Sequence, residues 1–396
     1  MQRASSARDL SRSATKTRIL VLGTGVTLLG VLRVLADAGA EVVALPDADA
    51  MSRRSRWYRA GPPSLAGVRP ATLATRLESV PSPTVLIPCS DGWVRAVAML
   101  GPSLRDRYPA SVAPLDAVDT LVDKGRFRAV LERLDLPHPR TYDLSIVADL
   151  DRVSDAAMAS CFLKPVRSQE FFARFAVKAF MTTGKSDARE KLATAIGEGF
   201  EMMLQEYIPG PATSHYFIDG FVDRNGVCRA RFARRRLRMN PPDFGNSTLM
   251  ISVPLSDVAP AAATLDALFA EIHYRGVFSA EFKRDERDGI FKLIEVNARP
   301  WWYVEFASRC GVNVCELAVQ DALGREVSTI THYEVGRVCV YPYYDLEAAQ
   351  AQRAAGRLTA LGWMRSWIGS YQPVFRWSDP LPAAGEIAGI LRRRYT

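Results

Sequence analysis

Two adjacent strand-like segments carry the feature that most constrains this chain. The segment FSAEFKRDERDGIFKLIEVNARPWW (278–302) alternates on both sides of a turn, and each side has one glutamate, Glu281 and Glu295. With RDG as a three-residue loop and Gly289 in the left-handed position, one register sets the two glutamates directly opposite each other. Their Cβ atoms would then be about 5 Å apart, with Asn297 on the same face. Two carboxylates this close repel each other unless a cation lies between them.

The hairpin therefore favours a metal site. Mg²⁺ prefers hard oxygen ligands and is usually bound by one or two carboxylates together with substrate phosphates. The order Glu295-x-Asn297-x-Arg299 adds an amide oxygen and a cation to the pair. The alternative is a solvated hairpin face with ordinary charges, and the apolar neighbours of both glutamates count against it. We predict that Glu281, Glu295 and Asn297 bind a metal ion.

Composition sets the broad class of the protein. The 396 residues, 48% hydrophobic and 24% charged, suffice for two or three globular domains. The formal charge of +8 favours anionic partners, such as nucleotides or nucleic acid. None of the six cysteines forms C-x-x-C or has zinc spacing, so we expect reduced thiols in a cytoplasmic protein. No uninterrupted apolar run is long enough to span a bilayer.

The N-terminal part of the chain reads as a leader followed by an α/β domain. Residues 1–16 are rich in Ser, Arg and Ala, and we predict a disordered leader. Residues 18–45 read as strand, glycine turn, helix and strand, which is the opening of a doubly wound sheet. A signal-peptide core is the alternative, but Gly23, Gly25 and Gly30 interrupt it. The turn is only G-x-G, with no acidic residue clearly placed for a ribose, so we do not expect NAD binding.

Polar groups follow several predicted strands. Ser90 and Asp91 come after the strand TVLIP, where capping of the next helix and contact with substrate are both open. Lys164 ends the apolar strand CFLK, and Lys124 begins a helical stretch; each is either a point charge for phosphate or a solvated end. The strand QEYIPG (205–210) stops at Pro-Gly, where free backbone groups can pair with the edge of adenine.

The segment RARFARRRLR (229–238) is strongly basic. Strand alternation sorts its arginines into two faces. Arg229, Arg231 and Arg235 share one face, and Arg234, Arg236 and Arg238 share the other. A face turned toward an anionic active site, a solvated strand and a nucleic-acid patch are the three interpretations. The absence of an aromatic stacking platform counts against the last.

Taken in order, these motifs resemble the ATP-grasp superfamily, and within it the carboxylate–amine ligase or D-aspartate ligase-like subgroup. The motifs are IPxSD (87–91), DKxxF (123–127), LKP (163–165), QEYIPG (205–210) and SAEFKRDERDGIFKLIEVNARPWW (279–302). The resemblance covers roughly residues 17–320 and, loosely, the tail FRWSDPLP (375–382).

The resemblance implies a mixed α/β and α+β fold in three parts. A Rossmann-like pre-ATP-grasp domain would span 17–118, and a two-lobed ATP-grasp domain would span 119–324. The N-terminal lobe of that domain would end at residue 210, and the C-terminal lobe would fill 211–324. Residues 325–396 would form a small C-terminal extension with one strand, two helices and a Pro-rich segment.

The resemblance also implies roles for individual residues. Lys124 and Lys164 would contact ATP phosphates, with Lys164 also serving catalysis. Glu206, Tyr207 and Ile208 would form the adenine hinge, with His215 on the ribose side or in a structural role. Arg299 would stabilise the transferring phosphoryl group, with Arg235 and Arg238 as helpers. Many members cover the phosphates with a glycine-rich loop; here VRSQEFFARFAVKAF (166–180) has no glycine, and a lid would use Arg167, Ser168 or Lys178. Trp301 and Trp302 would shape the substrate pocket or belong to the core.

The implied activity is ATP-dependent ligation of a carboxylate to an amine. Transfer of the γ-phosphoryl group would give an acyl-phosphate with a good leaving group, and amine attack would yield an amide, ADP and phosphate. The cofactors would be ATP and Mg²⁺, with Mn²⁺ as an alternative. The partners would be small-molecule substrates, with no nucleic acid and no membrane span, and a homodimer is left open. The alternatives are an ATP-grasp kinase or carboxylase, although no biotinyl-acceptor motif is present, or a non-catalytic nucleotide sensor.

Overall fold

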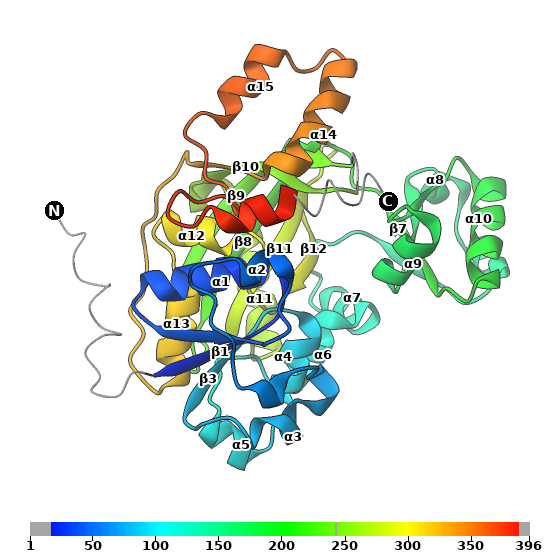
Figure 1. Cartoon of the computed structure of the whole chain (residues 1–396). Helices are drawn as coiled ribbons and strands as arrows, with labels where there is room; N and C mark the ends of the chain where they lie inside the picture. Colours follow the sequence, from blue (N-terminus) through cyan, green and yellow to red (C-terminus); the bar gives the residue numbers. More distant parts are fainter. Residues whose placement is uncertain (1–16, 242–243, 388–396) are drawn as a thin grey trace.

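The computed structural model describes residues 17–241 and 244–387 of the chain. These residues form a body, made of an N-terminal domain and a large lobe, and a smaller lobe that stands to one side (Figure 1). The leader predicted for residues 1–16 lies outside the described residues. Within the described ranges, no helix is long and apolar enough to cross a membrane.

The N-terminal domain is built on a parallel sheet in the order β2-β1-β3. Its strands are β1 (Arg18–Leu22), β2 (Glu41–Ala44) and β3 (Thr84–Pro88). Its helices are α1 (Gly25–Asp37), α2 (Ala50–Arg53), η2 (Pro63–Leu65), η3 (Pro70–Thr72), α3 (Leu73–Leu77), α4 (Asp91–Ala98) and α5 (Pro102–Arg107). The predicted strand–turn–helix–strand order over residues 18–45 is thus confirmed.

A side chain of the protein itself, that of Asp49, occupies the glycine turn before α1. Gly25 has a φ of +70°, which favours glycine, and its N–H donates to Asp49 Oδ2 at 2.6 Å. A carboxylate at this helix start would repel the pyrophosphate of a dinucleotide. The expectation that this domain does not bind NAD stays a prediction.

The small lobe has an antiparallel sheet in the order β4-β7-β5-β6. Its elements are β4 (Thr141–Leu144), η4 (Val147–Arg152), α8 (Asp155–Met158), β5 (Cys161–Pro165), α9 (Ser168–Phe175), β6 (Phe180–Met181), α10 (Lys185–Gly197) and β7 (Met202–Glu206). From its sequence, CFLKPVRSQEFFARFAVKAF (161–180) reads as a strand, a short loop and a second strand-like piece, and this prediction is wrong for α9. Phe171 and Phe175, one helical turn apart, pack with Phe180 and Phe200, and this apolar contact favours a helix.

The large lobe has a six-stranded sheet in the order β12-β11-β8-β9-β10-β13. Its strands are β8 (His215–Val222), β9 (Cys228–Asn240), β10 (Asn246–Val253), β11 (Gly276–Arg284), β12 (Phe291–Asn297) and β13 (Val338–Val340). Its helices are α6 (Leu115–Val122), α7 (Lys124–Arg133), η5 (Ala212–Ser214), η6 (Leu255–Val258), α11 (Ala259–Glu271), α12 (Val304–Arg309), α13 (Val314–Ala322), α14 (Pro342–Ala354) and α15 (Ala360–Trp367). Because β13 pairs with β10, the predicted C-terminal extension completes this sheet.

The register of the β11–β12 hairpin places Glu281 opposite Glu295, as the sequence predicted. The loop differs from the prediction. A bulge follows Glu281, and Asp285 N–H donates to Ile290 O at 2.9 Å, so the turn is four residues long rather than RDG alone. Gly289 is left-handed, with a φ of +75°, as expected. The bulge changes the register by one residue, so a longer turn still gives the predicted carboxylate pair.

Among the described residues, the body contains three hydrophobic clusters, and one of them joins the N-terminal domain to the large lobe. Apolar side chains of β1, α1, α12 and α13 pack in a single cluster, and a Cβ on Gly30 would lie 2.9 Å from Val304 Cγ1. Arg33, fully buried in α1, forms ion pairs with Glu305 at 3.2 Å and with Asp379 at 3.1 Å. The small lobe has its own core. The small lobe is therefore packed separately from the body.

Candidate active site

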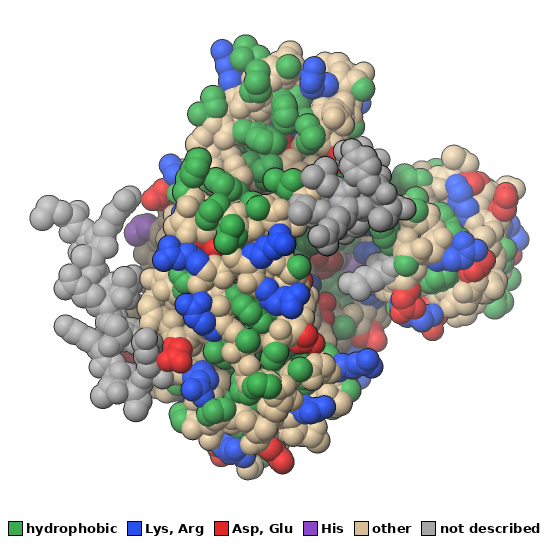
Figure 2. Space-filling model, viewed as in Figure 1, with side chains coloured by type: hydrophobic (Ala, Val, Ile, Leu, Met, Phe, Trp, Pro, Cys, Tyr) green, Lys and Arg blue, Asp and Glu red, His purple; other side chains and the backbone are tan. Residues whose placement is uncertain are grey.

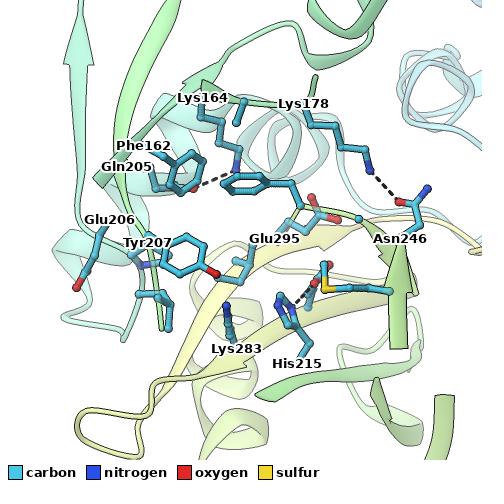
Figure 3. Close-up of a pocket in the computed structure, with 18 of the residues that line it drawn as sticks. Phe162, Lys164, Lys178, Gln205, Glu206, Tyr207, His215, Asn246, Lys283 and Glu295 are labelled. Atoms are coloured by element: carbon cyan, nitrogen blue, oxygen red, sulfur yellow. Dashed lines mark hydrogen bonds and ion pairs between the residues drawn. The ribbon is translucent and has the colours of Figure 1, made fainter. Parts of the chain in front are cut away.

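A cavity of about 520 Å³ lies between the small lobe and the large sheet. Figure 2 shows the molecule hollowed between the body and the small lobe. In Figure 3, Lys164 and Lys178 reach the cavity from one side, and His215 and Lys283 reach it from the other. The charged or polar side chains that line it are Lys164, Lys178, Gln205, Glu206, Tyr207, His215, Arg236, Asn246, Glu281, Lys283 and Glu295.

Glu281 is fixed in place on β11. Its Oε1 accepts hydrogen bonds from His215 Nδ1 at 2.7 Å and from Arg236 Nη2 at 3.0 Å. Burial opposes its ionisation, but the Arg236 guanidinium and the His215 hydrogen bond outweigh burial and lower the pKa of Glu281 to about 2. Burial in turn lowers the pKa of His215, and the neutral ring must carry its proton on Nδ1, since a carboxylate can only accept.

Glu295 is the first residue of a series of hydrogen bonds that runs from the cavity to the N-terminal domain. Asn297 Nδ2 donates to Glu295 Oε1 at 3.1 Å, and Arg299 Nη2 donates to Asn297 Oδ1 at 2.9 Å. Arg299 Nε then donates to Asp91 Oδ1 at 2.7 Å, at the start of α4 in the N-terminal domain. Asn297 and Arg299 are thus connected to the cavity through Glu295 although neither lines it.

Three lysines of the predicted phosphate set converge on the same region. Lys164 Nζ donates to Gln205 Oε1 at 3.2 Å, and Lys178 Nζ donates to Asn246 Oδ1 at 3.1 Å across the two lobes (Figure 3). Burial lowers the pKa of both ammonium groups. Lys124 lines an adjoining cavity that shares Lys164, and burial followed by repulsion from Lys164 lowers its pKa to about 8. A surplus of cations therefore faces the two carboxylates.

The predicted hinge lies at the end of β7. Glu206 N–H donates to Arg140 O at 2.8 Å, and Tyr207 N–H donates to Ser160 O at 2.7 Å. The Glu206 carboxylate points away from the cavity in Figure 3 and pairs with Arg287. Its contribution to a ligand site would therefore come from its backbone. Lys283 Nζ lies 4.7 Å from the Tyr207 ring centroid, which places a cation beside the hinge.

The structure brings most of the predicted residues together and displaces others. Arg235 lies outside the cavity, where its Nε donates to Thr213 O at 2.6 Å and its guanidinium covers Tyr216. Arg238 is tied to the buried carboxylate of Asp345 at 2.7 Å. Arg236, on the opposite face from Arg235, reaches Glu281 instead, so the cavity-facing arginine is one position further along β9.

Other predicted contributors lie elsewhere. Arg167 is exposed and pairs with Glu170 at 2.8 Å. Ser168 begins α9, but its side chain lies outside the described residues. Trp301 is 5% exposed within the core, whereas Trp302 stacks on Tyr344.

Four charged or polar cavity residues were not predicted from the sequence, namely Gln205, Arg236, Asn246 and Lys283. Lys283 could have been predicted, since it lies two residues after Glu281 and hence on the same side of β11. Strand alternation placed Arg236 on one of the two faces of β9. Alternation alone did not show which of these faces meets the cavity. Asn246 gave no signal, because it comes from a strand distant in sequence.

The donor set fits Mg²⁺ bound together with phosphate. Among the described residues, no three His, Cys, Asp or Glu side chains gather closely enough to hold a metal alone. Two opposed carboxylates with an amide oxygen are an incomplete set, and phosphate oxygens commonly supply the remaining ligands of Mg²⁺. The lysines around the carboxylates provide the charge that such phosphates require.

No protein-family model matches the chain. A D-aspartate ligase from Enterococcus faecium (strain Aus0004) is 23% identical over 258 residues, which are 63% of this chain and 61% of that protein. The chain therefore matches less than two thirds of the length of this curated relative.

Solved structures share the architecture. The L-amino acid ligase of Bacillus licheniformis has a TM-score of 0.58 at 14% identity, covering 80% of this chain and 76% of that one. N5-carboxyaminoimidazole synthetase of Staphylococcus aureus, complexed with ADP, has a TM-score of 0.59 at 13% identity and 82% coverage of each chain. Biotin carboxylase of Campylobacter jejuni has a TM-score of 0.60 at 14% identity, covering 81% and 74%. The predicted mixed α/β and α+β fold class is thereby confirmed, whereas the bounds of its three parts stay a prediction.

Proposed function

We propose that this chain, which has the ATP-grasp fold, joins a carboxylate to an amine at the expense of ATP. The observation that carries the proposal is the opposed pair Glu281 and Glu295, which shares one cavity with Lys164 and Lys178 and has Arg236 hydrogen-bonded to Glu281. A triphosphate needs cationic side chains, and Mg²⁺ needs the carboxylates, so both requirements meet at one place.

Nucleotide binding would use both lobes. The apolar side chains of Phe162, Ile208, Phe244 and Ile294 line the cavity and would cover the base. Since the N–H groups of Glu206 and Tyr207 are engaged within the protein, we expect the N–H of Ile208 to be the hinge donor to adenine. The ammonium groups of Lys164 and Lys178 would hold the phosphates. Lys178 is already linked to the large lobe through Asn246, so it would hold the two lobes together over the nucleotide.

Phosphoryl transfer would depend on charge and position. Glu281, Glu295 and Asn297 would hold Mg²⁺, which supplies charge neutralisation of the phosphate oxygens. Arg236 and the hydrogen bond from His215 keep Glu281 ionised at neutral pH, so its carboxylate remains available as a ligand. Arg299 would stabilise the negative charge on the transferring group. The substrate carboxylate attacks the γ-phosphorus, ADP leaves, and an acyl-phosphate results.

The second step needs no side-chain nucleophile. A substrate amine attacks the acyl carbon, the C–O bond to phosphate breaks, and inorganic phosphate leaves as the amide forms. The amine must arrive deprotonated or lose its proton on attack. Because the compared proteins named as ligases act on amino acids, we propose that an amino acid is at least one of the two substrates.

ADP release in the presence of Mg²⁺ and ATP tests the proposal. The assay uses amino acids singly and in pairs, with bicarbonate as a separate arm. We expect ADP formation to depend on one particular carboxylate–amine pair, with amide, ADP and phosphate in equal amounts. If bicarbonate alone stimulates ADP formation, carboxylation would replace ligation as the proposed reaction. If no acid, amine or bicarbonate changes the rate of ADP formation, both reactions would be contradicted.

Two variants test whether ATP turnover depends on the opposed carboxylates. Glu295→Gln removes one of the two opposed carboxylates and should reduce turnover by at least roughly 100-fold, as loss of a charge-stabilising group typically does. Glu286→Gln, in the exposed turn of the same hairpin, is the matched control and should leave turnover unchanged. Equal turnover of Glu295→Gln and Glu286→Gln would contradict the metal assignment.

A further inference from the structure

Asp91 connects the N-terminal domain to the charged side of the cavity. It is the first residue of α4, directly after the strand β3, and its Oδ1 accepts from Arg299 Nε at 2.7 Å. Arg299 follows β12, the strand that carries Glu295 and Asn297. The contact spans 208 positions in the sequence and joins two separately folded sheets.

The Asp91 carboxylate is not required to cap α4. Ser90 is the N-cap, and its hydroxyl oxygen accepts the Trp93 N–H at 3.4 Å. Cap and ion pair are therefore divided between two adjacent residues. Capping is thus confirmed for Ser90, and Asp91 pairs with Arg299, whereas contact of either residue with substrate stays a prediction.

The contacts of Arg299 orient its guanidinium group. An arginine carries five N–H donors in a planar fork. Here Nε donates to Asp91, Nη2 to Asn297 Oδ1 at 2.9 Å, and Nη1 to Pro300 O at 3.3 Å. Each of the two Nη atoms keeps a further N–H, so the end of the fork can still reach an oxyanion.

We propose that Asp91 is a positioning residue that holds Arg299 in the orientation needed for phosphoryl transfer. The proposal rests on the function proposed above. A long arginine side chain has many rotamers, and fixing its Nε edge removes most of that freedom before substrate arrives. Asp91 also makes the geometry of Arg299 depend on how the N-terminal domain sits against the hairpin.

Two effects of Asp91 on Arg299 oppose each other. The carboxylate partly neutralises the guanidinium, which weakens its attraction for phosphate, and it also orients the group. Asp91 is 46% exposed, so water screens the neutralising effect, whereas a directional hydrogen bond of 2.7 Å remains effective. Orientation therefore dominates, and removal of the carboxylate should slow the reaction.

A double-mutant cycle tests whether Asp91 acts through Arg299. Asp91→Ala should lower kcat by roughly 10- to 100-fold with an unchanged KM for ATP, as a misplaced catalytic group does. In an Arg299→Ala background, Asp91→Ala should have no further effect. Asp91→Asn, which keeps an acceptor oxygen, should recover part of kcat. Equal effects of Asp91→Ala in both backgrounds, or an unchanged or increased kcat, would overturn the proposal.

The same helix offers a matched control. Arg95 on α4 pairs with Asp119 at 2.7 Å, in an ion pair of the same length that touches neither the cavity nor the hairpin. Asp119→Ala should leave kcat unchanged. If Asp119→Ala lowers kcat as much as Asp91→Ala does, the effect belongs to the stability of α4, and the positioning role is refuted.

A binding measurement separates this inference from the proposed function. Calorimetry compares Mg²⁺ with ADP against Mg²⁺ with ADP and fluoroaluminate, which imitates the transferring phosphoryl group. Asp91→Ala should weaken only the fluoroaluminate complex, by roughly 10-fold or more. Equal affinity of wild type and Asp91→Ala for that complex would refute the positioning role. Absence of any nucleotide binding by the wild type would refute the proposed function itself.

Discussion

The two opposed glutamates should respond differently to neutralisation, although they face each other across one hairpin. Glu281 accepts from Arg236 and His215, and the Arg236 side chain is 4% exposed. Glu281→Gln removes the counter-charge of a buried guanidinium and should destabilise the protein without nucleotide. Glu295 accepts from Asn297, and within the described residues it forms no ion pair. Glu295→Gln removes a like-charge repulsion but also the attraction of Glu295 to Lys124 and Lys164, so it should change stability less than Glu281→Gln does.

The pKa of Glu281 sets the magnitude. The drop from its ordinary 4.5 to about 2 corresponds to about 3 kcal/mol, at 1.36 kcal/mol per pKa unit. The sign follows from the direction of the shift. A carboxyl with a depressed folded-state pKa contributes stability above its unfolded-state pKa, and this contribution is lost as pH falls toward about 2. For Glu295→Gln, relief of one cross-strand repulsion is worth at most about 1 kcal/mol.

Urea unfolding at pH 7, followed by tryptophan fluorescence, measures both variants against wild type. Glu281→Gln should lower the unfolding free energy by about 3 kcal/mol relative to Glu295→Gln. The gap should narrow below pH 4.5, where Glu281 of the unfolded wild type becomes protonated. Equal stability of the two variants at pH 7 would refute the reasoning, because it would mean that Arg236 does not depend on Glu281.

Three further predictions concern other parts of the molecule. Because burial lowers the pKa of Lys124 to about 8, the KM for ATP should be flat below that pH and rise above it as the ammonium deprotonates, and Lys124→Arg should flatten the profile. Lys164→Met should raise the KM for ATP by roughly 10- to 100-fold, as loss of a charge-assisted contact does, without changing the urea midpoint. Arg33→Met should lower the unfolding free energy by about 3–5 kcal/mol, since it leaves Asp379 buried without its arginine, although Glu305 keeps its pair with Arg309. The first prediction would be contradicted by an unchanged pH profile of KM in Lys124→Arg, and the second by an unchanged KM for ATP in Lys164→Met. The third would be contradicted by a wild-type unfolding free energy in Arg33→Met.

Local pattern predicted the parts of the fold that depend on neighbouring residues. The strand–helix–strand opening, the end of β7 shortly before Pro209 and Gly210, and the pairing of Glu281 with Glu295 all follow from periodicity and turn chemistry over short stretches. The hairpin loop was wrong in detail, because a bulge is set by packing on the rest of the sheet. The helix α9 was missed, because its Phe171 and Phe175 pack on Phe200, which lies far from them in sequence.

The site residues could be predicted only where they belong to a recognisable sequence motif. Alternation along β9 separated Arg235 from Arg236 correctly, but which face meets the cavity depends on how the small lobe docks. The partners of Lys178 and Arg299, namely Asn246 and Asp91, come from other sheets. Contacts of this kind depend on tertiary packing, and a single sequence carries no local signal for them.

A crystal structure with Mg²⁺ and a non-hydrolysable ATP analogue tests the central claim most directly. We expect a metal ion bound by carboxylate oxygens of both Glu281 and Glu295, at about 2.1 Å, with phosphate oxygens completing its coordination. A nucleotide bound elsewhere on the protein, or one bound in this cavity with no metal at either glutamate, would contradict the account.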